Sequence, residues 1–72
     1  LIPNPSSGKT LIRLGQVSDS PLRIRDMQGR LVHQVKSPEK EQTVDLKALP
    51  RGIYQVEYFD GTEMLSGLLR LE

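Results

Sequence analysis

The chain has 72 residues, with ten Lys and Arg, nine Asp and Glu, one His and no Cys, which gives a formal net charge of +1. A chain near this length buries only roughly 60% of the surface that its unfolded form exposes, which argues against a deep catalytic cavity. Neither a disulfide nor a Cys-based metal site can brace so small a core, and the balanced charge does not indicate nucleic acid or an anionic membrane as a partner.

These bounds predict one domain over residues 1–72, stabilised by apolar packing alone. The chain starts at Leu1 without a Met, so we expect a fragment of a longer protein. The absence of Cys carries no evidence about the redox compartment.

The N-terminal segment is dense in turn-forming residues. Pro3 and Pro5, with Asn4 between them, are incompatible with a helix or a central strand, and the Ser-Ser sequence before Gly8 favours a chain reversal. We predict an extended edge segment followed by a turn. A flexible linker is the alternative, because Pro, Ser and Gly clusters also occur there.

Two short runs that follow favour β-strands. Residues 10–14 are rich in β-forming side chains, and residues 22–25 alternate between apolar and charged. The alternation predicts that Leu22 and Ile24 face a core while the intervening arginines face solvent.

Arg23 and Arg25 are therefore expected side by side in solvent. With Arg13 they form a candidate basic strip for phosphate or nucleic acid. No aromatic residue is interleaved with them to stack on bases, so we expect an ordinary solvated sheet face and no nucleic-acid partner.

A hairpin is predicted where Asp26 is followed three positions later by Gly29. This pattern suits a type I turn closed by a left-handed residue. Residues 30–36 are the expected return strand. His33 has no second His and no Cys to complete a metal site, so we interpret it as a residue on the strand surface.

A corner is predicted around residues 44–54. Residues 42–46 alternate as a strand with Val44 and Leu46 toward the core, and a helical turn is expected at most over 46–49. Pro50 cannot donate to a sheet ladder and Gly52 permits positive φ, so one strand ends here and the next begins.

Tyr54 follows this corner by two residues, as in the tyrosine corner of sandwich domains. In that arrangement the hydroxyl returns to backbone a few residues upstream. The alternative is a half-buried strand tyrosine with a hydrated hydroxyl.

The last predicted strands are 53–59 and 62–71, joined by a two-residue Asp60-Gly61 loop. Tyr54, Val56 and Tyr58 share the core face of the first. The second is expected to bend or break at Gly67. In it the alternation separates two groups, with Leu65, Leu69 and Leu71 on one face and Leu68 and Arg70 on the other.

Short strands with frequent turn signals predict an all-β fold, an immunoglobulin-like antiparallel β-sandwich of six to seven strands. A partly open barrel is the alternative, because strand number alone does not separate one curled sheet from two packed ones.

Four segments, residues 3–9, 26–32, 44–54 and the terminal leucine-rich strand, occur in an order that resembles the C-terminal sorting domain of the type IX secretion system. The resemblance covers nearly the whole chain. The residues that form its structural motifs here are Pro3, Asn4, Pro5, Gly8, Asp26, Gly29, Pro50, Gly52 and Tyr54.

The resemblance implies an immunoglobulin-like sandwich at the end of a cargo protein of Gram-negative bacteria, secreted or held at the cell surface in association with the outer membrane. It implies the type IX translocon and outer-membrane shuttle and sortase proteins as partners. It also implies removal of the domain by a sortase-like protease and attachment of the cargo to lipopolysaccharide.

The C-terminal end departs from the family pattern. Members usually end in the manner of Lys-Leu-Ile-Lys; here Gly67 stands at the first Lys, and Arg70 keeps the second charge. This difference supports an alternative, an uncleaved structural or interaction sandwich of a surface-located component of the secretion machinery.

From the resemblance and the alternation we predict a partner-recognition segment at the C-terminus. Completing the core is the other interpretation of these residues. The segment consists of Gly67, Leu68, Leu69, Arg70, Leu71 and Glu72.

Three functional classes are weighed. An enzyme needs a nucleophile with a base, a carboxylate pair or a metal site, and the sequence offers none, so we predict a non-catalytic domain without cofactor, metal or catalytic residues. A sorting or docking module needs only an exposed strand to add to a partner sheet, and this is our prediction. A structural or carbohydrate-binding accessory domain is the third class. Contact with the parent protein's preceding domain and self-association through an edge strand are also expected.

Overall fold

The computed structural model describes residues 2–4 and 9–72, which contain seven β-strands and no helix. The strands lie close to the predicted runs. Only the first, which contains a proline, is as short as three residues. They are β1 (Ile2–Asn4), β2 (Lys9–Arg13), β3 (Leu22–Asp26), β4 (Leu31–Val35), β5 (Glu41–Asp45), β6 (Gly52–Phe59) and β7 (Met64–Leu71).

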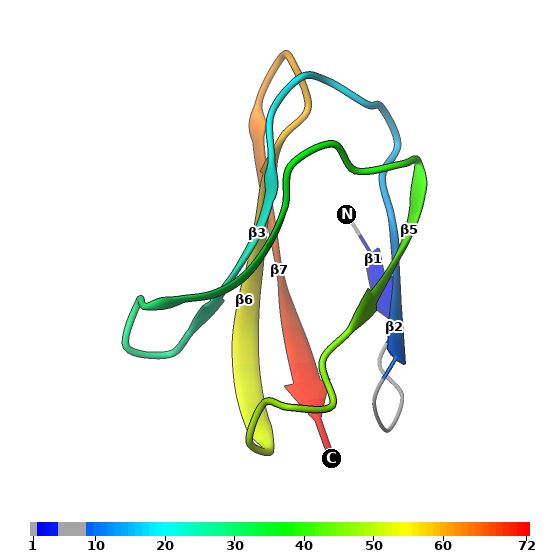
Figure 1. Cartoon of the computed structure of the whole chain (residues 1–72). Coiled ribbons are helices and arrows are strands. Elements are labelled where there is room, and N and C mark those ends of the chain that lie inside the picture. The colour runs from blue at the N-terminus through cyan, green and yellow to red at the C-terminus, as the bar shows by residue number, and fades with distance from the viewer. Residues whose placement is uncertain (1, 5–8) are drawn as a thin grey trace.

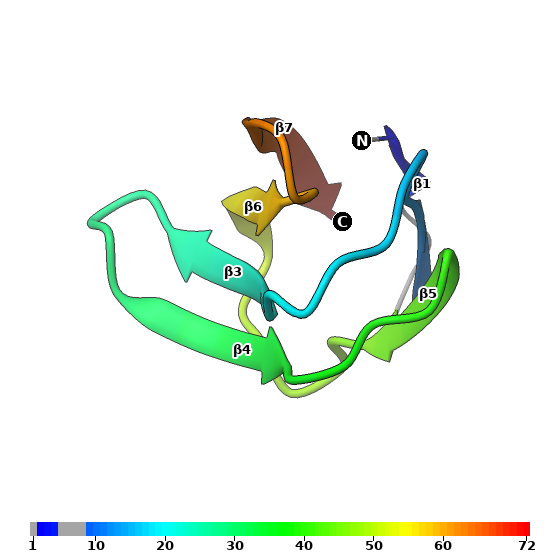
Figure 2. The ribbon, with the colours of Figure 1, turned by 90° about the horizontal axis from the view of Figure 1, so that it is seen from above.

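The strands form two antiparallel sheets that face one another as two layers (Figures 1 and 2). One sheet has the order β1-β2-β5 and the other β4-β3-β6-β7. The chain crosses between the layers after β2, after β4 and after β5, as in immunoglobulin-like sandwiches. The predicted sandwich is confirmed, and a single curled sheet is not formed.

The core lies between the layers, and the period-two pattern builds it. Leu22 and Ile24 of β3 are fully buried, as predicted, and Val44 and Leu46 close the core from the other sheet. Three alternate residues of β6 point the same way. The buried apolar residues are Ile12, Leu14, Leu22, Ile24, Val44, Leu46, Tyr54, Val56, Tyr58, Leu69 and Leu71.

Two details of the last hairpin differ from prediction. The loop between β6 and β7 has four residues, 60–63, because the side chain of Asp60 accepts hydrogen bonds from the N–H groups of Thr62 and Glu63 and so stabilises a wider turn. Gly61 in this loop does have positive φ. Strand β7 is not interrupted at Gly67, which pairs in continuous register with Val56.

The connection predicted to contain at most a helical turn has one turn, in which the N–H of Leu49 donates to the carbonyl of Leu46 at 3.0 Å. No helix in the described residues is long and apolar enough to cross a membrane. The β3–β4 hairpin contains a bulge, since the register shifts between Ile24 and Arg25 and leaves Val32 as an extra residue.

Candidate functional site

The predicted recognition segment forms the end of β7 and pairs with the start of β6. Leu69 and Leu71 lie against the core opposite Tyr54 and Gly52, and both are buried. Leu68 and Arg70 are exposed on the outer face, and Glu72 follows the strand end in solvent. The structure thus separates the segment into side chains that hold the strand and side chains that are free to contact a partner.

Strand β7 is also an edge strand, next to β6 on one side only. The other three edges carry features that discourage pairing: β1 is short and contains Pro3, β5 begins with Glu41 and ends with Asp45, and β4 has the bulge at Val32. Strand β7 has eight residues, unbroken register and a single charge, Arg70. Its backbone pairs with β6 alone, and β1 of the other sheet lies close to it.

The corner next to this segment is a tyrosine corner, as predicted. The hydroxyl of Tyr54 donates to the carbonyl oxygen of Pro50 at 2.5 Å. Gly52 has a φ of +147°, so the chain turns between these two residues in a conformation that favours glycine. Tyr54 is buried near the start of β6, and the start of β6 lies at the bottom of Figure 1, which we call the lower end of the sandwich.

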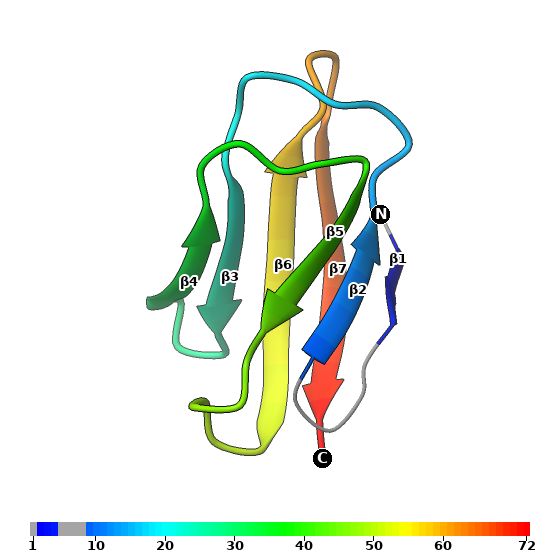
Figure 3. The same cartoon turned by 45° about the vertical axis from the view of Figure 1, so that its right-hand side comes forward.

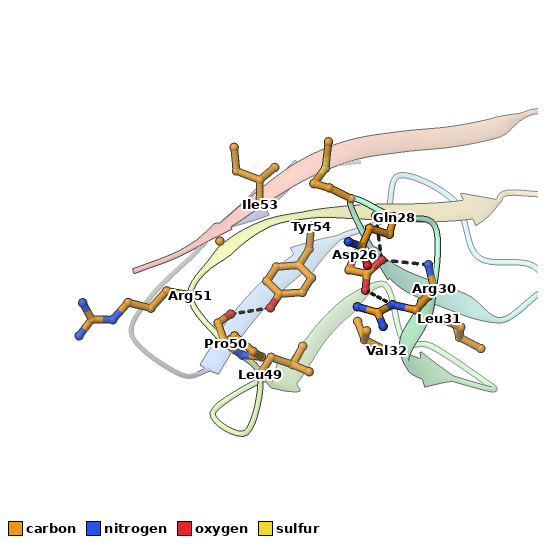
Figure 4. Close-up of a pocket in the computed structure, with 12 residues that line it drawn as sticks. Asp26, Gln28, Arg30, Leu31, Val32, Leu49, Pro50, Arg51, Ile53 and Tyr54 are labelled. Atoms are coloured by element: carbon orange, nitrogen blue, oxygen red, sulfur yellow. Dashed lines mark hydrogen bonds and ion pairs between the residues drawn. The ribbon is translucent and has the colours of Figure 1, made fainter.

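The corner separates two open hollows. The larger, of about 540 Å³, lies between the corner and the β3–β4 turn, with Tyr54, Leu49 and Val32 in its wall (Figure 4). The smaller, of about 340 Å³, lies between the corner and the end of β7 at Leu71 and Glu72. The recognition segment and the Asp26 turn therefore both border the corner.

The β3–β4 turn is held by Asp26, whose carboxylate accepts hydrogen bonds from the N–H groups of Gln28 and Arg30, both at 2.9 Å. It also contacts the guanidinium of Arg30 at 2.8 Å (Figure 4). Gly29 has a φ of +86°, which confirms the predicted turn. The backbone N–H of Arg30, more than its charge, holds the pKa of Asp26 below its ordinary value.

The candidate basic strip does not form. Arg13 lies on β2 in the other sheet, near Glu41. Arg23 and Arg25 do share the outer face of β3, but both are half-buried, and Arg25 binds Glu57 at 2.7 Å and also donates to the carbonyl of Gly29. Alternation along one strand does not show which acidic residue the neighbouring strand places beside it, so the pairing of Arg25 with Glu57 was not predicted.

Two other predicted features have partial outcomes. His33 is half-buried opposite Ile24, inside the bulge of β4, and is not simply a surface residue. Pro3 and Asn4 lie in the edge strand β1, as expected, whereas Pro5 and Gly8 lie outside the described residues. In the part of the chain that the structure describes, no group of three or more His, Cys, Asp and Glu side chains could hold a metal ion.

A second tyrosine contact, at the upper end of the sandwich, was not predicted from the sequence. The hydroxyl of Tyr58 accepts a hydrogen bond from the N–H of Ser18 at 2.6 Å, and the Ser18 hydroxyl donates to the carbonyl of Phe59. Gln16 donates to the carbonyl of Asp60 at 2.9 Å. We call this set of residues the upper latch. Because the hydroxyl of a buried tyrosine needs a hydrogen-bond partner, the core position of Tyr58 could have predicted such a contact. The sequence does not identify the partner, because Ser18 is 40 positions away.

A family model described as the secretion system C-terminal sorting domain matches residues 1–67. This span contains the β3–β4 turn, the loop at 60–63 and the tyrosine corner. No curated protein and no solved structure matches the chain. The chain therefore belongs to the family of type IX secretion system C-terminal sorting domains, which act as sorting signals of secreted or cell-surface proteins.

Proposed function

We propose that this domain directs its parent protein across the outer membrane by docking on the type IX translocon through the segment from Gly67 to Glu72. The observation that supports this most directly is the division within β7. Leu69 and Leu71 are buried and fix the strand, whereas Leu68 and Arg70 project into solvent from a strand that pairs with β6 alone.

The edge and the side chain supply different parts of the recognition. Backbone groups along the free edge of β7 add to a partner sheet, which gives affinity that is independent of sequence. Arg70 has no ion pair among the described residues and meets an acidic or carbonyl-rich groove on the translocon. The domain needs no catalytic group for this role.

The remaining partners follow from the same role. The 72 residues act as one terminal module of a longer parent and contact its preceding domain. Outer-membrane shuttle and sortase proteins receive the cargo, which is released or held at the outer membrane surface. No cofactor and no nucleic acid takes part.

A second candidate is an uncleaved domain in a surface-located component of the secretion machinery. It is favoured by Gly67, which replaces the first Lys of the usual family ending. The two candidates differ in the fate of the domain. Mass spectrometry of the delivered protein decides between them, since loss of these residues supports cargo and their retention supports the machinery component.

The test appends the 72 residues to a periplasmic reporter in a cell with a type IX system and measures the reporter at the surface. The variant Arg70→Glu should lower delivery while circular dichroism shows an unchanged fold. Lys36→Glu makes the same change of sign in an exposed loop away from β7 and should be neutral. Normal delivery of folded Arg70→Glu would contradict the role of Arg70.

The position of β7 at the edge of its sheet also leads us to predict self-association. An isolated domain whose β7 has no partner sheet should pair through this edge or exchange strands with a second copy. Light scattering over a concentration series should show a dimer that increases with concentration. A monomer throughout the series would refute the prediction.

A further inference from the structure

The outer faces of the two sheets differ in composition. Across β2 and β5 the face of the three-stranded sheet places Lys9 opposite Asp45 and Arg13 opposite Glu41, so its charges are balanced by neighbours. The face of the four-stranded sheet carries most of the exposed large apolar side chains in the described residues. These are Leu31, Ile53, Phe59, Met64 and Leu68.

The apolar side chains gather on β6 and β7, which lie side by side (Figure 3). Phe59 stands directly opposite Met64, and Leu68 is a diagonal neighbour of Ile53. Met64 and Leu68 are 62% and 66% exposed, and Ile53 is 43% exposed. The two apolar pairs lie at opposite ends of the same face, with Glu57 and Ser66 between them. Large apolar side chains gathered on one exposed face mark interaction surfaces in soluble domains.

The charges on this face determine what complements it. Glu57, the acidic residue on β6, forms an ion pair with Arg25, with 2.7 Å between Oε1 and Nε. Both side chains are partly buried. Arg23 and Arg70 have no ion pair within residues 9–72. The face is therefore apolar with an excess of uncompensated positive charge.

We infer that the outer face of β6 and β7, here called the docking face, binds an apolar protein surface that places a carboxylate opposite Arg70. The docking face consists of Ile53, Phe59, Met64, Leu68 and Arg70. This inference rests on the proposed function and specifies the chemistry of its partner. It extends the recognition site beyond residues 67–72, to the start and end of β6 and the start of β7.

A second copy of the chain is a poorer complement for this face. Face-to-face packing of two copies would bring Arg70 and Arg23 of each against uncompensated positive charge, while Glu57 is already paired. A lipid surface also fits less well, because Glu57, Gln55 and Ser66 interrupt the apolar side chains and the two unpaired arginines lie on β3 and β7, with β6 between them.

The test uses the reporter fusion with the double variant Ile53→Thr/Met64→Thr, which leaves residues 67–72 intact. Surface delivery should fall about tenfold, equivalent to ~1.4 kcal/mol of binding free energy. The matched control is Val17→Thr/Met27→Thr, which removes two exposed apolar side chains from loops outside the docking face and should deliver normally. Arg70→Lys should retain delivery better than Arg70→Glu.

The fold of each variant is checked by circular dichroism and thermal melting. If the double variant unfolds, the single variants replace it, each with an expected loss of about threefold. Binding to vesicles of mixed phosphatidylcholine and phosphatidylglycerol tests a lipid surface as the partner. Light scattering tests a second copy of the chain. Vesicle binding or a dimer that the double variant abolishes overturns the inference.

The two proposals fail in different ways. A reporter with the unaltered tail that is delivered, together with a folded double variant that is delivered equally well, overturns the docking face and leaves the sorting role intact. A reporter with the unaltered tail that never reaches the surface overturns the sorting role, and the docking face with it.

Discussion

At the lower end of the sandwich, the hydroxyl of Tyr54 reaches back only four residues, to the carbonyl of Pro50. At the upper end, the hydroxyl of Tyr58 binds the N–H of Ser18, 40 positions earlier, in the connection between the two sheets. Both tyrosines belong to β6 and share its core face. One strand therefore fixes both ends of the fold, once by a local contact and once by a long-range contact.

The surroundings of the two hydroxyls also differ. Pro50 is exposed, so water can reach its carbonyl when the tyrosine is absent. Ser18 is half-buried and uses its N–H and its hydroxyl on β6. The lower corner depends more on backbone conformation, and the upper latch more on its hydrogen bonds.

The largest expected effect is at the lower end, in Gly52→Val. With φ at +147°, a β-branched residue is strained there, and we expect a loss of about 1–3 kcal/mol in the free energy of unfolding. Urea titration measures it. Gly15→Val is the control, since Gly15 has open space around it and no positive φ, and it should change stability by less than about 0.5 kcal/mol. An unchanged midpoint for Gly52→Val would mean that the corner is not strained.

The next effect is at the upper end, in Tyr58→Phe. Loss of the hydroxyl leaves the half-buried N–H of Ser18 without its acceptor, so we expect a cost of about 1–2 kcal/mol. In a domain of this size that lowers the melting temperature by roughly 4–8 °C per kcal/mol. Hydrogen exchange of the Ser18 amide should accelerate in the variant, and unchanged exchange would argue against the latch.

Tyr54→Phe should cost less, about 0.5–1.5 kcal/mol, because the carbonyl of Pro50 is accessible to water. The double variant with Tyr58→Phe should show additive losses, since the two contacts share no partner. Chemical denaturation of the three proteins measures the coupling. A larger loss for Tyr54→Phe than for Tyr58→Phe would reverse the ranking of the two ends.

The smallest effect concerns acid, and each end contributes one aspartate. The N–H of Arg30 lowers the pKa of Asp26, and the N–H of Glu63 lowers that of Asp60. Because both pKa values are lower in the folded state, their stabilisation is complete above the unfolded pKa of about 3.9 and is lost as the pH falls through the folded values. Melts between pH 7 and pH 2 should show this decline.

Asn at either position removes the titration but keeps the acceptor oxygen. Asp26→Asn and Asp60→Asn should therefore each flatten the decline below about pH 4. If the melting temperature falls equally steeply with pH in the variants and in the unaltered chain, these carboxylates do not contribute to the pH dependence of stability.

Local features were predictable from the sequence, and long-range contacts were not. The turn at Asp26 and Gly29 and the corner from Pro50 to Tyr54 depend on residues within a few positions of one another, where φ preferences and side-chain acceptors decide the structure. The Asp60 loop was predicted too short because its side chain serves two N–H groups, and composition does not show which of them it reaches.

The candidate site shows the same division. Alternation correctly separated Leu69 from Leu68 and Arg70, since it follows from strand geometry alone. It did not show that Glu57 would pair with Arg25, or that Ile53 would stand next to Leu68, because these neighbours come from the register between strands. Residues far apart in sequence meet only once the register is known.

The pairing of distant strands also sets the time that folding requires. Strand β3 pairs with β6, and the ion pair across them joins residues 32 positions apart. Pairing strands this far apart in sequence closes long loops of chain. Folds that depend on such long-range pairs form in milliseconds to seconds. During synthesis β2 lacks its second neighbour until β5 has emerged, and β3 lacks its second neighbour until β6 has emerged. The chain therefore stays unfolded for an interval after β2 and β3 are made. The fold is completed only when β6 and β7, the later strands, pair with the rest.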